Sequence, residues 1–319
     1  MESAVPLVVV VGPTASGKSS LAVELCLRLG GEVVNADALQ LYRGMDIGTA
    51  TTPPDERRGV PHHLVDVLDV AEAASVAAFQ ERARAVVADC RDRGAVPVLV
   101  GGSSLYVRAV VDDLDFPGTD PDVRARYAAR LEAEGAEAMH AELARVAPEA
   151  AAHILPSNGR RLVRALEVTE ITGRPFRATM PPHRSVVGPV AMIGLDVPRE
   201  VLDVRIAERV DAMWSAGLLE EVRRLRRQGL DDAPTAARAL GYAQAAAQLD
   251  GELTEEQARA ATARATSAFA RRQDRLFRKD PRIAWLPFDA PTLAEDAAAL
   301  VEAARHRGVD GSELPGGRA

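Results

Sequence analysis

Apolar positions fall into two patterns along the chain: short unbroken runs and stretches with helical spacing. The unbroken runs at 7–11, 97–100 and 190–195 are typical of strands buried on both faces of a parallel sheet, and 32–35 has a similar character. Residues 20–29 carry a leucine at every fourth position, which predicts a helix after the first run. This alternation of strands and helices predicts an α/β fold in which helices flank a parallel sheet.

The chain changes character between two stretches that contain turn-forming residues, Gly118–Pro121 and Met180–Pro182. Between them, residues 123–134, 136–146 and 160–172 have apolar positions at helical spacing and suitable capping residues. We therefore expect a helical insertion within the α/β core. The expected parts are the first part of the core at 1–118, the insertion at 119–187, the second part of the core with basic C-terminal helices at 188–308, and a disordered tail at 309–319.

A phosphate-binding motif directly follows the first apolar run. Residues 12–19 fit G-x-x-x-x-G-K-[ST], with a predicted strand before them and a predicted helix after them, so the core is expected to be P-loop NTPase-like. Its backbone N–H groups can surround phosphate oxygens, the compact charge of Lys18 can reach them, and the Ser19 hydroxyl can ligate Mg²⁺. The predicted phosphate-binding residues are Gly12, Pro13, Thr14, Ala15, Ser16, Gly17, Lys18 and Ser19.

Polar residues also follow the second and third predicted strands. Asp37 comes after the second strand and Ser103 after the third, and ligands in open α/β sheets bind beyond these strand ends. We therefore expect both residues to converge on the phosphate loop, where a carboxylate can accept a proton or hold Mg²⁺ through water. Asp37 could instead cap a following helix. The pair Gly101–Gly102 could be a tight turn or a point of close backbone approach.

Composition excludes several classes of protein. The chain has 319 residues, of which 47% are hydrophobic and 27% charged, as in ordinary globular proteins. Cys26 and Cys90 lie far apart, so neither a disulfide framework nor a cysteine zinc site is expected. The longest apolar stretch, 6–11, is far shorter than the roughly 20 residues that a membrane span needs, and no basic segment precedes it. We expect a cytoplasmic, monomeric protein without a membrane partner.

Two signatures of other P-loop proteins are missing. The sequence contains no Asn-Lys-x-Asp motif for guanine, and Gly101 stands at the end of the third strand, where a motor ATPase would carry an acid. A GTPase or motor ATPase is therefore disfavoured, and a transferase that acts on a small substrate is favoured.

Taken in order, the motifs resemble those of the bacterial tRNA dimethylallyltransferases. The resemblance covers about residues 8–285. After 12–19, the matching segments are 35–50, 61–66, 100–106, 158–167, 240–242 and 271–273. The family usually has threonine at the position of Ser103, but serine keeps the hydroxyl group. Arg275 and Leu276 replace its usual Thr-Trp pair, which leaves Phe277 as the aromatic residue that could stack on a base.

The resemblance implies a Mg²⁺-dependent prenyl transfer. In this family a dimethylallyl group passes from dimethylallyl diphosphate to N6 of the adenosine on the 3′ side of the tRNA anticodon, and pyrophosphate leaves. Asp37 matches the position of the base that takes the proton from the amine. Lys18, the loop N–H groups and Arg238 would stabilise the leaving pyrophosphate. The implied catalytic residues are Asp37, Ser103 and Arg238.

The resemblance also implies contact with the tRNA anticodon arm. The implied tRNA-binding residues are Asp37, Ala38, Leu39, Gln40, Ser103, Arg124, Arg160, Arg161 and Arg164. Arginines outnumber acids over 160–184, and basic residues outnumber acids over 259–282, which fits phosphate contact. Both stretches could instead be solvated or salt-bridged helix faces, and the insertion could be a structural lid.

Three alternatives remain at this point. One is an adenylate isopentenyltransferase that acts on free nucleotide, and the second is a small-molecule kinase in which ATP occupies the loop. The basic segments favour tRNA over both, because a free nucleotide needs no such surface. The third is a P-loop module that binds RNA without chemistry.

Overall fold

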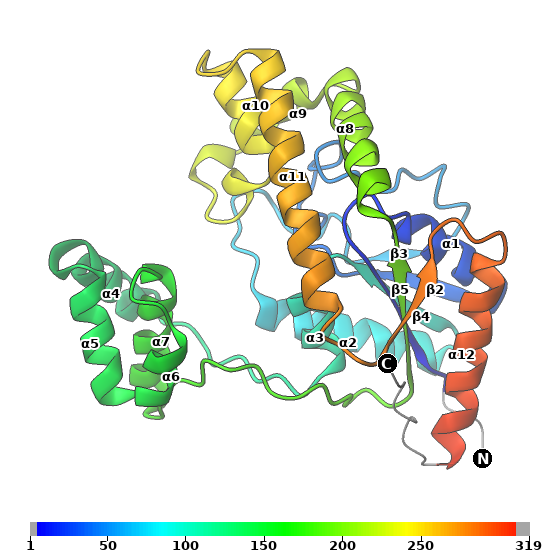
Figure 1. The fold of residues 1–319 in the computed structure, drawn as a ribbon, viewed down its shortest axis with the longest axis horizontal. Helices are drawn as coiled ribbons and strands as arrows, with labels where there is room; N and C mark the ends of the chain where they lie inside the picture. The colour runs from blue at the N-terminus through cyan, green and yellow to red at the C-terminus, as the bar shows by residue number, and fades with distance from the viewer. Residues whose placement is uncertain (1–4, 311–319) are drawn as a thin grey trace. The chain divides into compact units, whose positions relative to one another are not determined.

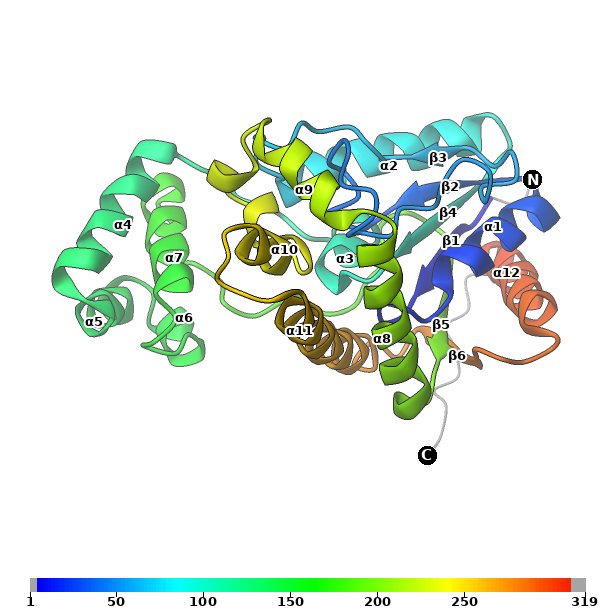
Figure 2. The same cartoon turned by 90° about the horizontal axis from the view of Figure 1, so that it is seen from above.

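A single parallel sheet forms the centre of the larger of the chain's two compact units. The computed structural model describes residues 5–310, with side chains as far as 306. Figure 1 shows the fold, and six parallel strands lie in the order β3-β2-β4-β1-β5-β6, whose labels can be followed in Figure 2. They are β1 Leu7–Val11, β2 Gly31–Asn35, β3 His62–His63, β4 Val96–Gly101, β5 Val190–Asp196 and β6 Ile283–Pro287. In the register of the sheet, Val9 of β1 lies opposite Leu99 of β4 and Met192 of β5.

Helices cover both faces of this sheet, and Figure 2 shows α1 and α12 together on one side of it. Val8 and Val10 pack in one apolar cluster with α1 and α12, whereas Leu7, Val9 and Val11 pack in another with α2 and α3. Successive side chains of a strand point to opposite faces, so a central strand needs apolar residues at every position. The helices around the sheet are α1 Lys18–Leu29, α2 Val76–Asp92, α3 Ser104–Val111 and α12 Leu293–Asp310.

A further group of helices follows β5 and has its own apolar cluster. This cluster includes Trp214, Leu218 and Tyr242 from the helices together with Tyr42 and Met45 from the loop after β2. The loop that leaves the sheet beyond Asp37 is therefore packed against these helices. The group comprises α8 Arg199–Ser215, α9 Leu218–Arg226, α10 Tyr242–Leu249 and α11 Glu255–Phe277, with short 3₁₀ helices at Leu230–Asp232 and Ala236–Arg238.

The insertion is a compact unit of its own, spanning Asp113–His183, whereas the sequence suggested 119–187. Its core includes Tyr127, Met139 and Leu162. The first helix begins with Pro121 and is capped by Asp120. The Asp120 carboxylate accepts hydrogen bonds from the backbone N–H groups of Asp122 and Val123. The helices of this unit are α4 Pro121–Glu134, α5 Ala136–Val146, α6 Pro148–His153 and α7 Gly159–Thr172.

The C-terminal end of the chain is described as far as residue 310. The tail predicted for 309–319 lies outside the described residues from 311 onward, and 309–310 still belong to α12. Within the described part of the chain, no helix is both long enough and apolar enough to cross a membrane.

Candidate functional site

The phosphate loop has the geometry that its sequence predicts. It connects the central strand β1 to α1, and Gly17, at φ 94°, turns the backbone directly into the helix. Lys18 is the first residue of α1, and its Nζ donates a hydrogen bond to the Pro13 carbonyl at 3.3 Å. The buried Ser16 hydroxyl has no hydrogen-bond partner among the described residues. The N–H groups at the start of α1 and the Lys18 ammonium together give this end of the helix the positive potential that would suit an anion.

Gln273 of α11 joins this loop to the end of β4. Its Oε1 accepts the Thr14 N–H at 2.9 Å, and its Nε2 donates to the Gly102 carbonyl at 2.9 Å. Only 5% of Gln273 is exposed, so both hydrogen bonds are shielded from water. The sequence comparison had included Gln273 in a matching segment without giving it a role.

The paired glycines after β4 allow close backbone approach, as one of the two interpretations predicted. A Cβ on Gly101 would lie 2.5 Å from the Ala36 carbonyl oxygen, and a Cβ on Gly102 would lie 2.3 Å from Gln273 Nε2. Both distances are shorter than van der Waals contact permits. Glycine therefore lets β4, the end of β2 and α11 meet beside the phosphate loop.

Asp37 lies half-buried just beyond β2, where hydrogen bonds with neighbouring residues of the same loop fix its position. Asn35 accepts the Asp37 N–H at 2.9 Å and donates to the Leu64 carbonyl at 2.9 Å, which ties the strand end to the following loop. The Asp37 Oδ1 accepts the Leu39 N–H at 2.9 Å. The residues that follow form turns and not a helix, so the alternative interpretation of Asp37 as a helix cap is wrong. The local Asx turn leaves the carboxylate at the wall of a cavity.

Two cavities adjoin at Arg209, a residue of α8 that sequence reasoning missed. The first, of about 550 Å³, is mainly apolar and also contains Asp37 and Arg238 in its wall. The second, of about 570 Å³, is lined by the phosphate loop. Apolar residues of the first include Ile206, Val210, Met213, Leu240, Ala265 and Phe269. Residues of the second include Gly17, Lys18, Ser19, Thr51 and Arg58.

Arg209 belongs to the walls of both cavities, and its Nη2 donates to the Thr49 carbonyl at 3.0 Å. Burial, and to a smaller extent the Arg209 charge, lower the pKa of Lys18 to about 8, and the Asp37 carboxylate opposes both effects. Burial also lowers the pKa of Arg209. Two poorly solvated cations therefore lie beside the loop, and the negative charge of a bound polyanion would compensate for their lost hydration.

The remaining predicted core residues take different places. Ser103 caps α3, with its Oγ accepting the Tyr106 N–H at 3.4 Å. Leu39 lines the apolar cavity, whereas Gln40 donates to the Thr49 carbonyl at 3.3 Å. Ala38 packs against the apolar cluster that includes residues of α2 and α3. Ser19 lies in the wall of the second cavity with Lys18.

The insertion's predicted tRNA-binding arginines divide into two groups. Arg124 pairs with the fully buried Glu167 through Nε at 3.0 Å and Nη2 at 2.9 Å, and Arg164 pairs with it at 3.1 Å. Both arginines neutralise this buried carboxylate. Arg161 donates to the Ala178 carbonyl at 2.6 Å, and Arg160 is exposed at the start of α7.

The basic helix α11 is partly a salt-bridged face and partly an open one. Arg259 pairs with Asp211 at 3.2 Å, as the salt-bridged interpretation predicts, whereas Arg264, Arg271 and Arg275 are exposed. Phe277 is only 3% exposed and packs in the apolar cluster between the sheet and helices α2 and α3. The expectation that it could stack on a base is therefore wrong.

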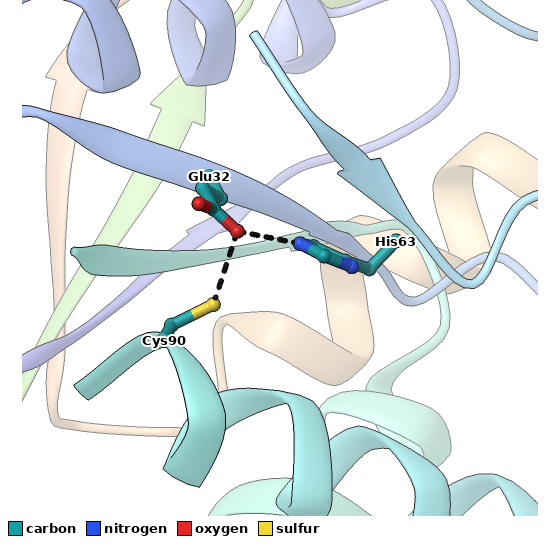
Figure 3. Close-up of side chains that lie close together, drawn as sticks. All are labelled: Glu32, His63 and Cys90. Carbon is teal, nitrogen blue, oxygen red and sulfur yellow. Dashed lines mark hydrogen bonds and ion pairs between the residues drawn. The ribbon is translucent and has the colours of Figure 1, made fainter. Parts of the chain in front are cut away.

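A separate cluster of potential metal ligands joins β2, β3 and α2. Glu32 accepts from His63 Nε2 at 2.7 Å and from Cys90 Sγ at 3.6 Å, as Figure 3 shows. Arg93 also binds this carboxylate, at 2.5 and 2.8 Å, and so neutralises it. Burial raises the pKa of Cys90 to about 11, which keeps it a thiol. A guanidinium and a protonated thiol suit an ion-pair cluster that fastens β3, not a cation site.

Comparison with known proteins agrees with this geometry. The family model described as "IPP transferase" matches residues 40–280. A tRNA dimethylallyltransferase from Thermobifida fusca is 61% identical over 300 residues, covering 92% of this chain and 94% of that protein. One from Streptomyces coelicolor is 59% identical over 308 residues, covering 95% and 98%.

Solved structures give the same result at greater distance. The crystal structure of a tRNA isopentenylpyrophosphate transferase from Bacillus halodurans has a TM-score of 0.71 and 37% identity, and the match covers 96% of this chain and 98% of that one. A Staphylococcus epidermidis tRNA isopentenylpyrophosphate transferase has a TM-score of 0.68 and 29% identity, with 95% and 99% covered. The chain therefore belongs to the IPP transferase family of tRNA dimethylallyltransferases.

Proposed function

We propose that this protein transfers a dimethylallyl group from dimethylallyl diphosphate to N6 of the adenosine on the 3′ side of the anticodon in tRNA. The observation that carries the proposal is the junction of two unlike cavities at Arg209. One is lined by the phosphate loop and suits a diphosphate. The other is apolar, suits a five-carbon group, and has Asp37 in its wall.

These positions suit a substitution at the first carbon of the donor. The exocyclic amine of adenine is a weak nucleophile because its lone pair is delocalised into the ring. As the new C–N bond forms, the Asp37 carboxylate accepts the amine proton, while the C–O bond to the diphosphate breaks and pyrophosphate takes its electron pair. Lys18 and Arg209 line the phosphate-loop cavity and stabilise the charge on this leaving group. Arg238 lines the apolar cavity, and its role toward the leaving group, like that of the Ser103 hydroxyl, rests on the family resemblance.

The residues present also fit a magnesium ion at the loop. Ser19 offers a hydroxyl oxygen in the cavity wall beside Lys18, and Mg²⁺ favours oxygen ligands completed by substrate phosphates and water. A bound Mg²⁺ would offset negative charge on the diphosphate. Ser19 is the residue that we propose as its protein ligand.

We propose tRNA as the acceptor because the relatives are named for it and because exposed arginines remain available for phosphate. Arg160 and Arg161 are exposed on the insertion, as are Arg264, Arg271 and Arg275 on α11. Arg124 and Arg164 serve first to neutralise Glu167, so their contribution to tRNA contact is expected to be smaller. A tRNA substrate also agrees with the expected cytoplasmic location.

A transfer assay tests the proposal directly. Purified protein, Mg²⁺ and labelled dimethylallyl diphosphate are incubated with unmodified tRNA or with AMP, and ATP is tested as an alternative donor. Label in tRNA from the wild type, lost in Asp37→Asn while tRNA binding persists, is the expected result. Label in AMP alone would assign a free-nucleotide enzyme, and ATP turnover without prenyl transfer would assign a kinase.

A further inference from the structure

A buried carboxylate in α9 organises the loop between β2 and β3. Glu221 is 2% exposed, and its two oxygens accept the consecutive N–H groups of Asp46, Ile47 and Gly48 at 3.0–3.3 Å. Tyr242 Oη donates to the same carboxylate at 2.6 Å. A charge this deeply buried is tolerated only when hydrogen bonds replace its hydration, and here three of those bonds come from a single turn of the loop.

The loop cannot move away from this contact without losing its packing. A Cβ on Gly48 would lie 2.3 Å from the ring of Tyr242, so the loop backbone is in close van der Waals contact with that ring. Thr49 Oγ1 donates to the Met45 carbonyl at 2.5 Å and closes the turn. The position of the next backbone carbonyl, that of Thr49, therefore depends on Glu221.

Thr49 lines the apolar cavity, and its carbonyl binds the arginine that this cavity shares with the proposed diphosphate site. The Thr49 oxygen accepts from Arg209 Nη2 at 3.0 Å and from Gln40 Nε2 at 3.3 Å. It is the acceptor that the structure shows for Arg209, the arginine shared by both cavities. A guanidinium on a flexible side chain needs such an acceptor to keep one orientation before its anion arrives.

We propose that Glu221 is a positioning residue for the transfer reaction: through the N–H groups of 46–48 it fixes the Thr49 carbonyl, which holds Arg209 in place for the diphosphate. The inference rests on the proposed function for its role in turnover. Glu221 has no part in the reaction as described above; it acts on Arg209, which does. Glu221 itself touches neither cavity among their described lining residues.

The test uses inorganic pyrophosphate with Mg²⁺ as the ligand, measured by titration calorimetry, alongside steady-state transfer and thermal unfolding. Glu221→Gln keeps the shape but replaces an accepting oxygen with an NH₂ group that cannot accept from a backbone N–H. It should weaken pyrophosphate binding by about tenfold or more and raise KM for the donor, with KM for tRNA unchanged. The matched control is Glu220→Gln, an exposed neighbour on the same helix, which should behave as wild type.

A double-mutant cycle separates positioning from general stability. In an Arg209→Gln background, Glu221→Gln should change pyrophosphate affinity by less than about twofold, because the residue through which it acts is gone. Tyr242→Phe removes one hydrogen bond and is the milder variant if Glu221→Gln does not fold; it should cost about fivefold in affinity, again only when Arg209 is present.

Equal losses in both backgrounds, or a lower unfolding temperature with unchanged pyrophosphate binding, would overturn the proposal. Failure of the proposed function looks different, because wild type would then transfer no prenyl group to tRNA. The pyrophosphate titration would still report whether Glu221 acts through Arg209.

Discussion

Replacing Arg209 with glutamine tests the arrangement at the junction of the cavities. The substitution keeps much of the side-chain volume but removes the charge that lies beside Lys18 and Asp37. The Thr49 carbonyl holds the Arg209 guanidinium in one orientation, so its charge is preorganised for the proposed leaving group. Loss of one preorganised donor of this kind typically costs about 2.7–4 kcal/mol, or about 100- to 1000-fold in kcat.

A change in the pKa of Lys18 partly offsets this loss. The Arg209 charge lowers the pKa of Lys18, so its removal raises that pKa and favours the ammonium form. With a pKa of about 8, Lys18 is already about nine-tenths protonated at pH 7, and the variant gains only about a tenth there. At pH 9 the wild-type ammonium is about one-tenth populated, so a rise in the pKa increases that fraction by a larger factor than at pH 7. The deficit of the variant should therefore be largest near neutrality and smaller at high pH.

The measurement is kcat/KM for the prenyl donor between pH 7 and pH 9, which reports ionisations of the free enzyme. Arg205→Gln is the control, because Arg205 lies one turn earlier on α8, stacks over Phe288 at 4.5 Å, and lines neither cavity in the described structure. It should stay within about twofold of wild type, as surface substitutions usually do. The reasoning is refuted if Arg209→Gln loses less than about threefold, or if its deficit is the same at every pH.

Three further outcomes follow from other contacts. Gln273→Ala leaves the Thr14 N–H and the Gly102 carbonyl without their buried partner, at about 1–3 kcal/mol, so KM for the donor should rise by about tenfold or more in the transfer assay. Burial alone would raise the pKa of Glu167, but hydrogen bonds from Thr119 and two arginines outweigh it and lower that pKa. The ionised carboxylate therefore stabilises the folded unit at pH values above the ordinary carboxyl pKa. The difference in unfolding free energy between wild type and Glu167→Gln should therefore shrink as the pH falls from 5 to 3, as followed by thermal melts. Arg160→Ala should weaken tRNA binding a few-fold in filter binding at low salt, and an effect that persists at high salt would contradict a phosphate contact.

The centre of the fold could be predicted from sequence because its signals are local. Residues 7–11 are apolar throughout because β1 lies between two strands and under helices on both faces. The phosphate loop is equally local, since its glycines and Lys18 act through the backbone of one turn and the helix that follows. Helix ends were predicted to within a few residues. For example, the first helix was expected at 20–29 and begins at Lys18.

Long-range contacts left no comparable signal. The strands β3 and β6 lie at the two edges of the sheet, and β3 is only two residues long, so neither shows the buried pattern of a central strand. Gln273 binds Thr14 from 259 positions away. Arg209 is one of many arginines in helical segments, and only the placement of α8 beside the loop distinguishes it. The excess of arginine in the insertion likewise could not reveal that Arg124 neutralises a buried glutamate.

The same contacts explain how a phosphate loop can serve a reaction other than phosphoryl transfer. A motor ATPase would carry an acid at the end of β4, but Gly101 stands there, and even a Cβ would lie 2.5 Å from the Ala36 carbonyl. No carboxylate can therefore reach the loop from that strand. The acid is Asp37, one strand further out, and it lines an apolar cavity instead of the cavity that holds Lys18 and Ser19. In the proposed reaction, this arrangement would keep the diphosphate on the phosphate-loop side of Arg209 and leave Asp37 facing the acceptor where it meets the apolar end of the donor.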